Sequence, residues 1–170
     1  MKNNDLLMSI KSIWIYRICN RLKTIEVRKR KPKHKPNFRV FLYCTKADPQ
    51  IYKSNINKVD YGVNKKRPDL TLNGKIVGHC TCTEIKEFRY NKKTFSYDIT
   101  DEDLAATCLT QEELKKYGKG EPLYGYVLKT VMLYAGPADI TEAYKTVDGK
   151  KIPITVAPQS WNYIDGVGII

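Results

Sequence analysis

Three charged residues, Lys23, Glu26 and Arg28, lie close together in the stretch NRLKTIEVRKRKPKHKP, residues 20–36. The part before the prolines alternates polar and apolar residues as a strand does, which would place Glu26 and Arg28 on one face, about 7 Å apart. A carboxylate held between two cations can accept hydrogen bonds from an exocyclic amine, as Glu does with cytosine. Lys23 and Arg28 would then meet phosphate or carbonyl oxygens. The alternative interpretation is an internal salt bridge, in which Glu26 only neutralises its neighbours.

Positive charge surrounds this group and is concentrated at one end of the chain. The net charge is +12, and residues 1–40 contain twelve Lys or Arg against two acids, which amounts to +10. Residues 101–113 are acidic instead. Such asymmetry predicts a side that faces a polyanion, with a merely solvated basic surface as the alternative. The residues that we expect to contact nucleic acid are Lys11, Lys23, Glu26, Arg28, Lys29, Arg30, Lys31, Lys33 and Lys35.

Hydrophobic periodicity and capping residues define the elements that must position these side chains. The first helix is indicated by apolar residues every three or four positions, among which Trp14 is interpreted as a core residue. Two later helices begin after Thr100 and Thr110, each of which is followed three residues later by an acid, and the second is expected to end at Gly118 as its C′ residue. The predicted strands are residues 5–10, 24–29, 38–45, 75–88, 123–135 and about 160–165, and the first helix is about 11–21.

Turn and breaker residues separate these elements. The basic segment that follows the second strand cannot be helical, because it contains Pro32 and Pro36 and its like charges repel. Asn73-Gly74 and Asp148-Gly149 are hairpin signals. Pro137 is expected to end the long strand before it.

Fold class follows from the order of the elements. Sequential strands with hairpin turns and few helices favour an antiparallel or mixed sheet closed towards a barrel, in an α+β domain with short flanking helices. A length of 170 residues suits one domain, 1–170. Residues 46–73 carry few regular signals and are interpreted as a long irregular insertion. Ile25 and Val27 are expected to be buried, with Glu26 on a concave surface.

Cysteine usage and the lack of other motifs exclude several classes of protein. The five cysteines, with no apolar leader at the N-terminus, indicate reduced thiols and a cytoplasmic location. The run His79-Cys80-Thr81-Cys82 offers only half of a zinc site, so we interpret its cysteines as small buried residues and expect no metal. We find no Gly-rich phosphate loop and no nucleophile elbow, and expect no cofactor. No apolar run is long enough to cross a membrane, so a membrane partner is not expected.

The stretches LMSIK and LKTIEVRKR, with a helix between them, resemble the ASCH domain of the PUA-like superfamily, in the form common in bacterial and phage genomes. The family motif is G-x-K-x-x-E-x-R, whose K, E and R places are taken here by Lys23, Glu26 and Arg28. Arg21 stands where Gly is usual, so we expect the turn to be made differently. The resemblance implies a small β-barrel with helices at its rim, covers most of the chain outside 46–70 and 136–153, and implies a cleft that holds RNA or a nucleobase, with Lys23 at its mouth.

Three functional classes are consistent with these observations. The first is binding of nucleic acid, RNA or a modified base, aided by aromatic residues between the cations, namely Phe38, Phe41, Tyr43, Tyr124 and Tyr126. The second is an enzyme, with Lys23 and Glu26 as the catalytic pair. The third is a protein-interaction role through residues 46–73, such as a phage protein that acts on a host protein.

The enzyme class follows from the resemblance in two forms. Some ASCH proteins are amidohydrolases that act on N-acylated cytidine with a Lys, a Thr and a Glu. Lys23 matches that Lys, and Glu26 stands at the Thr place. The distal Glu aligns near Thr107, in a predicted helical region whose acids are Glu102, Asp103, Glu112 and Glu113. Ribonuclease activity has also been proposed within the family, and Lys23 and Glu26 would then serve as general acid and base.

Overall fold

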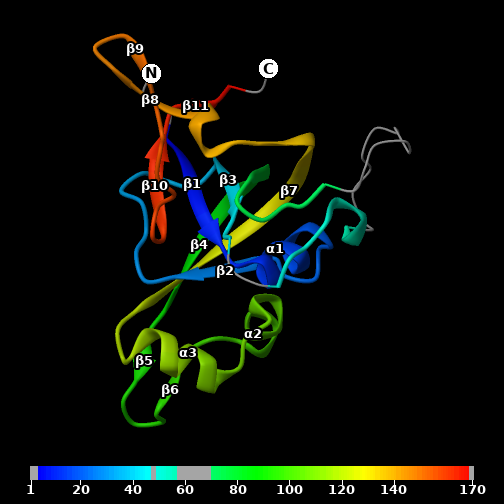
Figure 1. Ribbon diagram of the computed structural model, residues 1–170. Helices are drawn as coiled ribbons and strands as arrows, with labels where there is room; N and C mark the ends of the chain where they lie inside the picture. Colours follow the sequence, from blue (N-terminus) through cyan, green and yellow to red (C-terminus); the bar gives the residue numbers. More distant parts are fainter. Residues whose placement is uncertain (1–3, 47–48, 57–69, 169–170) are drawn as a thin grey trace.

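The computed structural model describes residues 4–46, 49–56 and 70–168. A six-stranded mixed sheet with the order β10-β1-β3-β4-β7-β2 forms the body of the molecule, and β1 and β3 are its parallel pair (Figure 1). Its strands are β1 (Asp5–Ile10), β2 (Ile25–Arg28), β3 (Phe38–Cys44), β4 (Ile76–Phe88), β7 (Leu123–Ala138) and β10 (Trp161–Ile164). Smaller sheets contain β5 (Tyr90–Asn91) with β6 (Ser96–Tyr97), and β8 (Ala143–Val147) with β9 (Lys150–Pro153) and β11 (Gly166–Val167). The helices are α1 (Ser12–Cys19), α2 (Asp101–Thr107) and α3 (Gln111–Gly118), with the 3-10 turns η1 (Lys53–Asn55) and η2 (Ile140–Glu142).

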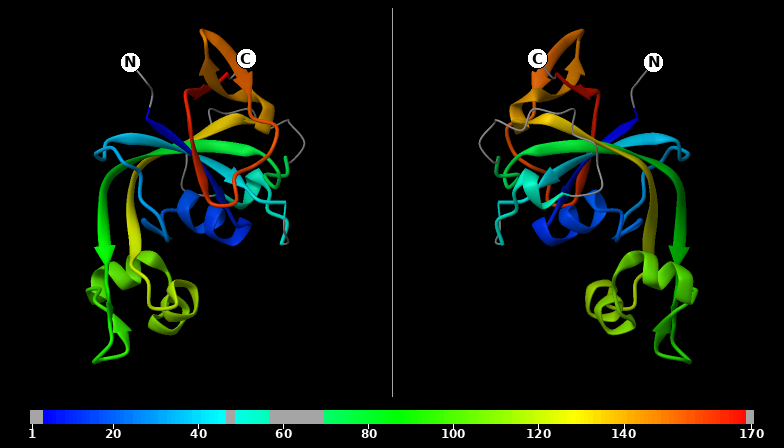
Figure 2. Two further views of the ribbon diagram at one scale, coloured as in Figure 1. Left: turned by 90° about the vertical axis from the view of Figure 1, so that its left-hand side faces the viewer. Right: turned by 90° about the vertical axis from the view of Figure 1, so that its right-hand side faces the viewer.

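The long strands β4 and β7 give the sheet its curl. They pair antiparallel along their length, and their register slips at three places, one of them between Cys82 and Glu84. Such bulges bend a strand and increase its twist, which closes a sheet towards a barrel. At Gly78 a side chain could not be accommodated, because a Cβ there would lie 2.1 Å from the Met132 carbonyl oxygen. Figure 2 shows both strands arching over α1 and then turning down towards α2 and α3.

Two apolar clusters hold the part of the molecule that concerns the site. Under the arch, Ile15 and Ile18 of α1 pack with residues of β1, β3 and β4. At the far end of β4 and β7, the helices α2 and α3 and the β5–β6 hairpin form a helical lobe with its own cluster. Ile25 and Val27 of β2 belong to that second cluster and are 3% and 5% exposed, as expected from the alternation. Strand β2 therefore faces the lobe with its apolar side and leaves its polar side for another surface.

Most local predictions are confirmed. Thr100 and Thr110 cap α2 and α3 through their hydroxyl oxygens, which accept hydrogen bonds from the amides of Asp103 and Glu113. The Asp148-Gly149 turn joins β8 to β9 with both residues at positive φ, as a two-residue hairpin turn requires. The basic segment between β2 and β3 is irregular. The mixed, partly closed sheet with short helices agrees with the expected barrel architecture.

Several boundaries differ from the prediction, each for a local reason. Strand β7 continues through Pro137 to Ala138, because the register slip between Ile76 and Gly78 leaves Pro137 outside the ladder, where no amide is needed. Gly118 is the last residue of α3 rather than its left-handed C′ residue. Lys119 takes that conformation at φ +54°, and a Cβ on Gly118 would lie 1.8 Å from the Tyr97 hydroxyl.

Three further elements differ from the sequence-based prediction. Asn73-Gly74 forms a turn, but within residues 49–56 and 70–72 only a single bridge, between Thr71 and Tyr52, precedes it, so no hairpin is formed by the described residues. The strands β5, β6 and β11 were not predicted, since two residues are too few to show periodicity. The predicted insertion 46–73 lies partly outside the described residues. Within the described part, no helix is both long and apolar enough to cross a membrane.

Candidate nucleic-acid interface

A pocket of about 330 Å³ lies where β1, α1, β2 and α3 meet. Lys23, Glu26 and Arg28 line it, together with Lys11 at the start of α1. The apolar side of β2 is occupied by the helical lobe, so the polar side of the strand forms one wall of the pocket. The expectation that Glu26 faces a hollow rather than a convex surface is therefore met by the geometry.

The three motif side chains form one buried ionic group. Glu26 forms an ion pair with Arg28, with an Nη2–Oε1 distance of 2.9 Å, and the Lys23 ammonium lies 3.4 Å from the other carboxylate oxygen. Lys23, Glu26 and Arg28 are only 2%, 5% and 8% exposed. Lys23 is thus at the floor of the pocket and not at its mouth, because its ammonium also donates to the Thr107 carbonyl oxygen on α2. The group carries a net charge of +1 next to the cavity.

The turn after α1 places Lys23. Arg21 adopts the left-handed conformation with φ +58°. Its amide donates to the Ile18 carbonyl at 3.0 Å and the Leu22 amide donates to the Arg17 carbonyl at 2.7 Å, which is the Schellman arrangement at a helix C-terminus. The expectation that Arg21 makes the turn differently is therefore wrong. The chain keeps the conformation that suits Gly, and Arg21 adopts it at some conformational cost.

Two aromatic rings flank the ionic group. The Lys23 ammonium lies 5.0 Å from the centre of the Trp14 ring, and the Arg17 guanidinium lies 5.1 Å from it. Tyr117 of α3 lines the same pocket and has the Lys29 ammonium 5.0 Å from its ring centre. Trp14 packs against the core, as expected, but it also lines the pocket. Both rings therefore line the pocket with cations lying over them.

Two polar groups in the pocket have no hydrogen-bond partner among the described residues. They are the Ser9 hydroxyl on β1 and the Nε of Arg28, although the Arg28 Nη2 donates to the Ser9 carbonyl oxygen at 2.8 Å. Leaving a buried donor or acceptor unpaired costs about 1–3 kcal/mol. Such groups at a cavity are therefore candidates for contacts with a ligand.

A second carboxylate reaches the pocket from α3. Glu113 lines the cavity together with Lys23, and its Oε2 accepts hydrogen bonds from the Thr110 amide and hydroxyl. These hydrogen bonds lower the pKa of the Glu113 carboxyl below its ordinary value. Near Thr107, where the resemblance implied the distal acid, the group that faces Lys23 is a main-chain carbonyl. Glu113 is thus the second acid that lines the pocket, although the alignment put the distal acid near Thr107.

The basic segment 29–37 leaves the pocket and crosses the molecule. Lys29 is at the pocket, through Tyr117. Arg30 lies over the Trp161 ring at 5.1 Å, and Lys31 lies over Tyr124 at 5.1 Å and 3.5 Å from a Glu87 oxygen. The predicted cations therefore divide into a pocket group (Lys11, Lys23, Arg28 and Lys29) and a surface group (Arg30, Lys31, Lys33 and Lys35).

Most of the strand aromatics do not serve as stacking surfaces. Phe38, Phe41, Tyr43 and Tyr126 are between 0% and 5% exposed and belong to the core, so a direct role in stacking is excluded for them. Of the five residues, Tyr124 alone is half-buried, under Lys31. Sequence reasoning missed several residues that line the pocket from distant elements, among them Ser9, Tyr117 and Gln159.

The cysteines and His79 play no part in this site. Cys80 and Cys82 are buried in the core as expected, and burial raises the pKa of Cys82 to about 12. His79 lies on the opposite face of β4, with its ring centre 5.5 Å from that of Phe41. Among the described residues, no three His, Cys, Asp or Glu side chains are grouped as metal ligands.

Comparison with known proteins identifies the fold. No protein-family model matches the chain, and no curated protein matches it. Solved structures do: the crystal structure of the ASCH protein from Zymomonas mobilis matches with a TM-score of 0.53 and 15% identity over 94% of this chain and 87% of that one. Two single-residue variants of the same protein match with TM-scores of 0.54 and 0.55 at 13% identity, over 95% of this chain and 90% and 89% of theirs. The chain thus has an ASCH-like fold, as the sequence resemblance implied.

Proposed function

We propose that this protein binds single-stranded nucleic acid, with RNA as the preferred form, by taking one base into the pocket that Lys23, Glu26 and Arg28 line. The observation that carries the proposal is the coincidence of three features at one cavity. They are a buried ionic group, two flanking aromatic rings, and two polar atoms without partners. An ion group that served stability alone would not need unpaired polar atoms beside it.

The geometry supports a specific role for Glu26. An ionised carboxylate offers about four lone-pair directions, and Lys23 and Arg28 each form an ion pair with one of its two oxygens. The remaining directions can accept from the exocyclic amine of cytosine or adenine. The two cations hold the carboxylate in one position. It would therefore bind only a base whose amine reaches that position, and it would not move to suit other bases. The Ser9 hydroxyl and the Arg28 Nε would meet further polar atoms of the base.

The cations around the pocket supply affinity without selecting a sequence. Lys11 and Lys29 are exposed beside the cavity, and the surface group continues along the basic segment. Cations of this kind contact phosphates, and binding through them weakens steeply with salt. For single strands, the logarithm of the binding constant falls with the logarithm of the salt concentration at a slope of about −0.7 per neutralised phosphate. Binding that is insensitive to salt, or no binding of RNA or DNA oligonucleotides at low salt, would contradict the proposal.

The decisive experiment compares Glu26→Gln with Glu87→Gln. Glu87 pairs with Lys31 on the surface, so both variants remove one negative charge near the basic segment. Both should leave or improve the affinity for oligonucleotides in general, because a charge that repels phosphate is lost. Only Glu26→Gln should lose the preference among bases, measured by fluorescence anisotropy with homopolymeric oligonucleotides. If base preference survives in Glu26→Gln while the melting temperature falls, Glu26 is only a salt-bridge partner.

A second candidate function is amidohydrolysis of N-acylated cytidine, and the position of Glu113 favours it. Lys23, Glu26 and Glu113 line one pocket, so an amine and two carboxylates face the same space. In this case Lys23→Ala, Glu26→Gln or Glu113→Gln should abolish deacylation while the nucleoside still binds. A ribonuclease would instead cleave the oligonucleotides of the binding assay, which gel electrophoresis detects.

The cellular setting is part of the same proposal. Five free cysteines, four of them buried, favour a reducing compartment, so we propose a cytoplasmic location. A bacterial or phage source stays a prediction from the resemblance, and a host protein as a partner stays a prediction from the segment 46–73.

A further inference from the structure

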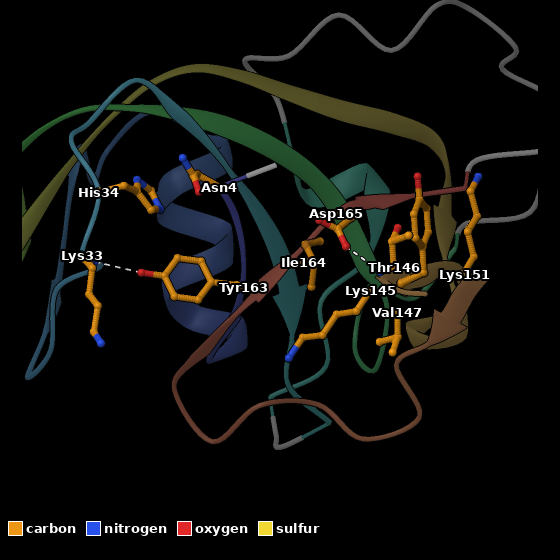
Figure 3. Close-up of a pocket in the computed structure, with 11 residues that line it drawn as sticks. Asn4, Lys33, His34, Lys145, Thr146, Val147, Lys151, Tyr163, Ile164 and Asp165 are labelled. Carbon is orange, nitrogen blue, oxygen red and sulfur yellow. Dashed lines mark hydrogen bonds between the residues drawn. The ribbon is translucent and has the colours of Figure 1, made fainter. Parts of the chain in front are cut away.

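A second and larger cavity, of about 940 Å³, lies between the basic segment, β10 and the β8–β9 hairpin (Figure 3). Lys33 and His34 line it from the basic segment, and Lys145 and Lys151 line it from the hairpin. Figure 3 shows Lys33 and Tyr163 at one end of the cavity and Thr146, Val147 and Lys151 at the other. Its volume is near the upper end of that found for small-molecule sites, about 1,000 Å³, so it has room for more than one nucleotide.

The cavity is positively charged. Three lysines line it against one acid, Asp165, which already accepts a hydrogen bond from the Thr146 amide. Among the described residues, neither Lys33 nor Lys145 forms an ion pair with a carboxylate. Uncompensated ammonium groups around a hollow attract an anion, and several in a row attract a polyanion.

Aromatic rings accompany these cations. The Tyr163 and His34 ring centres are 5.4 Å apart, and the Tyr163 hydroxyl accepts from the Lys33 amide at 2.9 Å, which fixes the ring. On the hairpin, the Lys151 ammonium lies 4.4 Å from the centre of the Tyr144 ring. These rings are half-buried. A cationic groove lined with aromatic rings is the arrangement with which proteins bind single strands irrespective of sequence.

The basic segment joins the two cavities. Arg28 lines the first and Lys33 lines the second. Five residues of chain span at most about 18 Å. At about 3.4 Å per stacked nucleotide, that is no more than roughly five nucleotides. The exposed cations Arg30 and Lys31 lie between Arg28 and Lys33 in the sequence.

We infer that the larger cavity holds the nucleotides that flank the base bound beside Glu26, so that the two cavities and the segment between them form one track for single-stranded RNA. This inference rests on the proposed function and extends it, because it assigns the β8–β9 hairpin a role in binding. Lys33, Lys145 and Lys151 contact phosphates, and Tyr163 stacks on a base. The track gives affinity that grows with oligonucleotide length, while the pocket at Glu26 reads one base.

The test compares the double variant Lys145→Ala/Lys151→Ala with Lys92→Ala/Lys93→Ala. Both remove two exposed lysines, and Figure 1 shows the hairpins that carry them at opposite ends of the molecule. The affinity of each variant for a dinucleotide and for an RNA of about eight nucleotides is measured at several salt concentrations. The variant Lys145→Ala/Lys151→Ala, called the β8–β9 hairpin variant, should bind the longer RNA roughly tenfold more weakly at ~0.1 M salt. The slope of the logarithm of its binding constant against the logarithm of the salt concentration should be about 1.4 smaller in magnitude. It should bind the dinucleotide as the wild type does. The control variant should match the wild type.

A second variant, Tyr163→Leu, tests the stacking component independently of charge. At high salt it should weaken binding of the longer RNA at least about fivefold, since stacking is not screened. Its melting temperature is measured in parallel, and the lysine pair keeps the inference testable if the variant does not fold.

Several outcomes overturn the inference. Equal losses for the two lysine pairs would mean general charge attraction, and equal losses for dinucleotide and longer RNA would place the hairpin at the first pocket. Unchanged binding of the longer RNA to the hairpin variant would exclude the track. If polyglutamate displaces the bound RNA from this site as effectively as unlabelled RNA does, the cavity is a surface for an acidic protein instead. Loss of base preference in Glu26→Gln tests the proposed function separately, so either can fail alone.

Discussion

Lys23 and Thr107 are 84 positions apart in the sequence, yet the Lys23 ammonium donates a hydrogen bond to the Thr107 carbonyl oxygen at the end of α2. The same ammonium faces Glu26 on β2. One side chain therefore ties the helical lobe to the sheet and completes the ionic group of the pocket.

Replacing Lys23 by Met should destabilise the protein strongly. The variant leaves Glu26 with one cation and the Thr107 carbonyl without its donor, both in a buried place, and breaking a buried pair costs about 3–5 kcal/mol. Lys86→Met is the matched control, because Lys86 also joins the sheet to α2, through Asp103, but is 33% exposed. The control should cost less than about 1 kcal/mol. Urea unfolding measures both, and equal losses would show that the burial of Lys23 carries no special cost.

Arg21→Gly should stabilise the protein. Arg21 is held at φ +58°, which costs an L-residue about 1–2 kcal/mol, while Gly loses about 0.5–1 kcal/mol in chain entropy. The expected net gain is up to about 1.5 kcal/mol in the free energy of unfolding. Arg21→Ala removes the side chain but keeps the Cβ, so it should bring no gain. A gain of the same size in both variants would attribute the effect to the loss of positive charge instead.

Ser9→Ala should separate stability from binding. The Ser9 hydroxyl is buried without a partner in the described part of the chain, so its removal should leave the melting temperature unchanged or raised. Oligonucleotide affinity should fall, because the hydroxyl would be paired only in the complex. Ser12→Ala is the control, since its hydroxyl is also buried and unpartnered but does not line the pocket. Equal affinities of the two variants would remove Ser9 from the site.

His79 should make stability depend on pH. Burial lowers the pKa of His79 below its ordinary value of 6.5, and the nearby charge of Arg39 lowers it further. The unfolded chain therefore takes up this proton first as the pH falls. The stability that neutral His79 contributes is fully present above about pH 6.5 and is lost as the pH falls through the folded-state pKa. In His79→Gln the loss of melting temperature between about pH 7 and about pH 5 should be smaller than in the wild type. Parallel curves for the two proteins would show that His79 does not contribute.

Local signals predicted much of the fold. The alternation in β2 placed Ile25 and Val27 in the core, and the caps at Thr100 and Thr110 marked both lobe helices, because each signal depends on neighbours within four residues. The β5 and β6 strands are too short to show a period. The path of β7 through Pro137 depends on a register slip against β4, which no local pattern encodes.

The site was predicted in part for the same reason. Lys23, Glu26 and Arg28 come from one continuous stretch, so their proximity could be inferred from the sequence. Ser9 and Tyr117 reach the pocket from β1 and α3, and only the curl of the sheet brings them together. The aromatic residues of the strands were predicted to stack on bases, yet most of them are buried in the core. The rings that line the pocket are instead those of Trp14 from α1 and Tyr117 from α3.

The continuity of β4 and β7 from the sheet into the helical lobe has a thermodynamic consequence for ligand binding. The lobe is joined to the sheet by two strands paired with each other rather than by a flexible linker, so its motion is limited to bending of that paired ribbon. The walls of the pocket that α3 and β2 supply are thus in place before a ligand arrives. A preorganised site loses little conformational entropy on binding. Its selectivity would then come from the fit of the ligand to fixed charges, and not from closure of the protein around it.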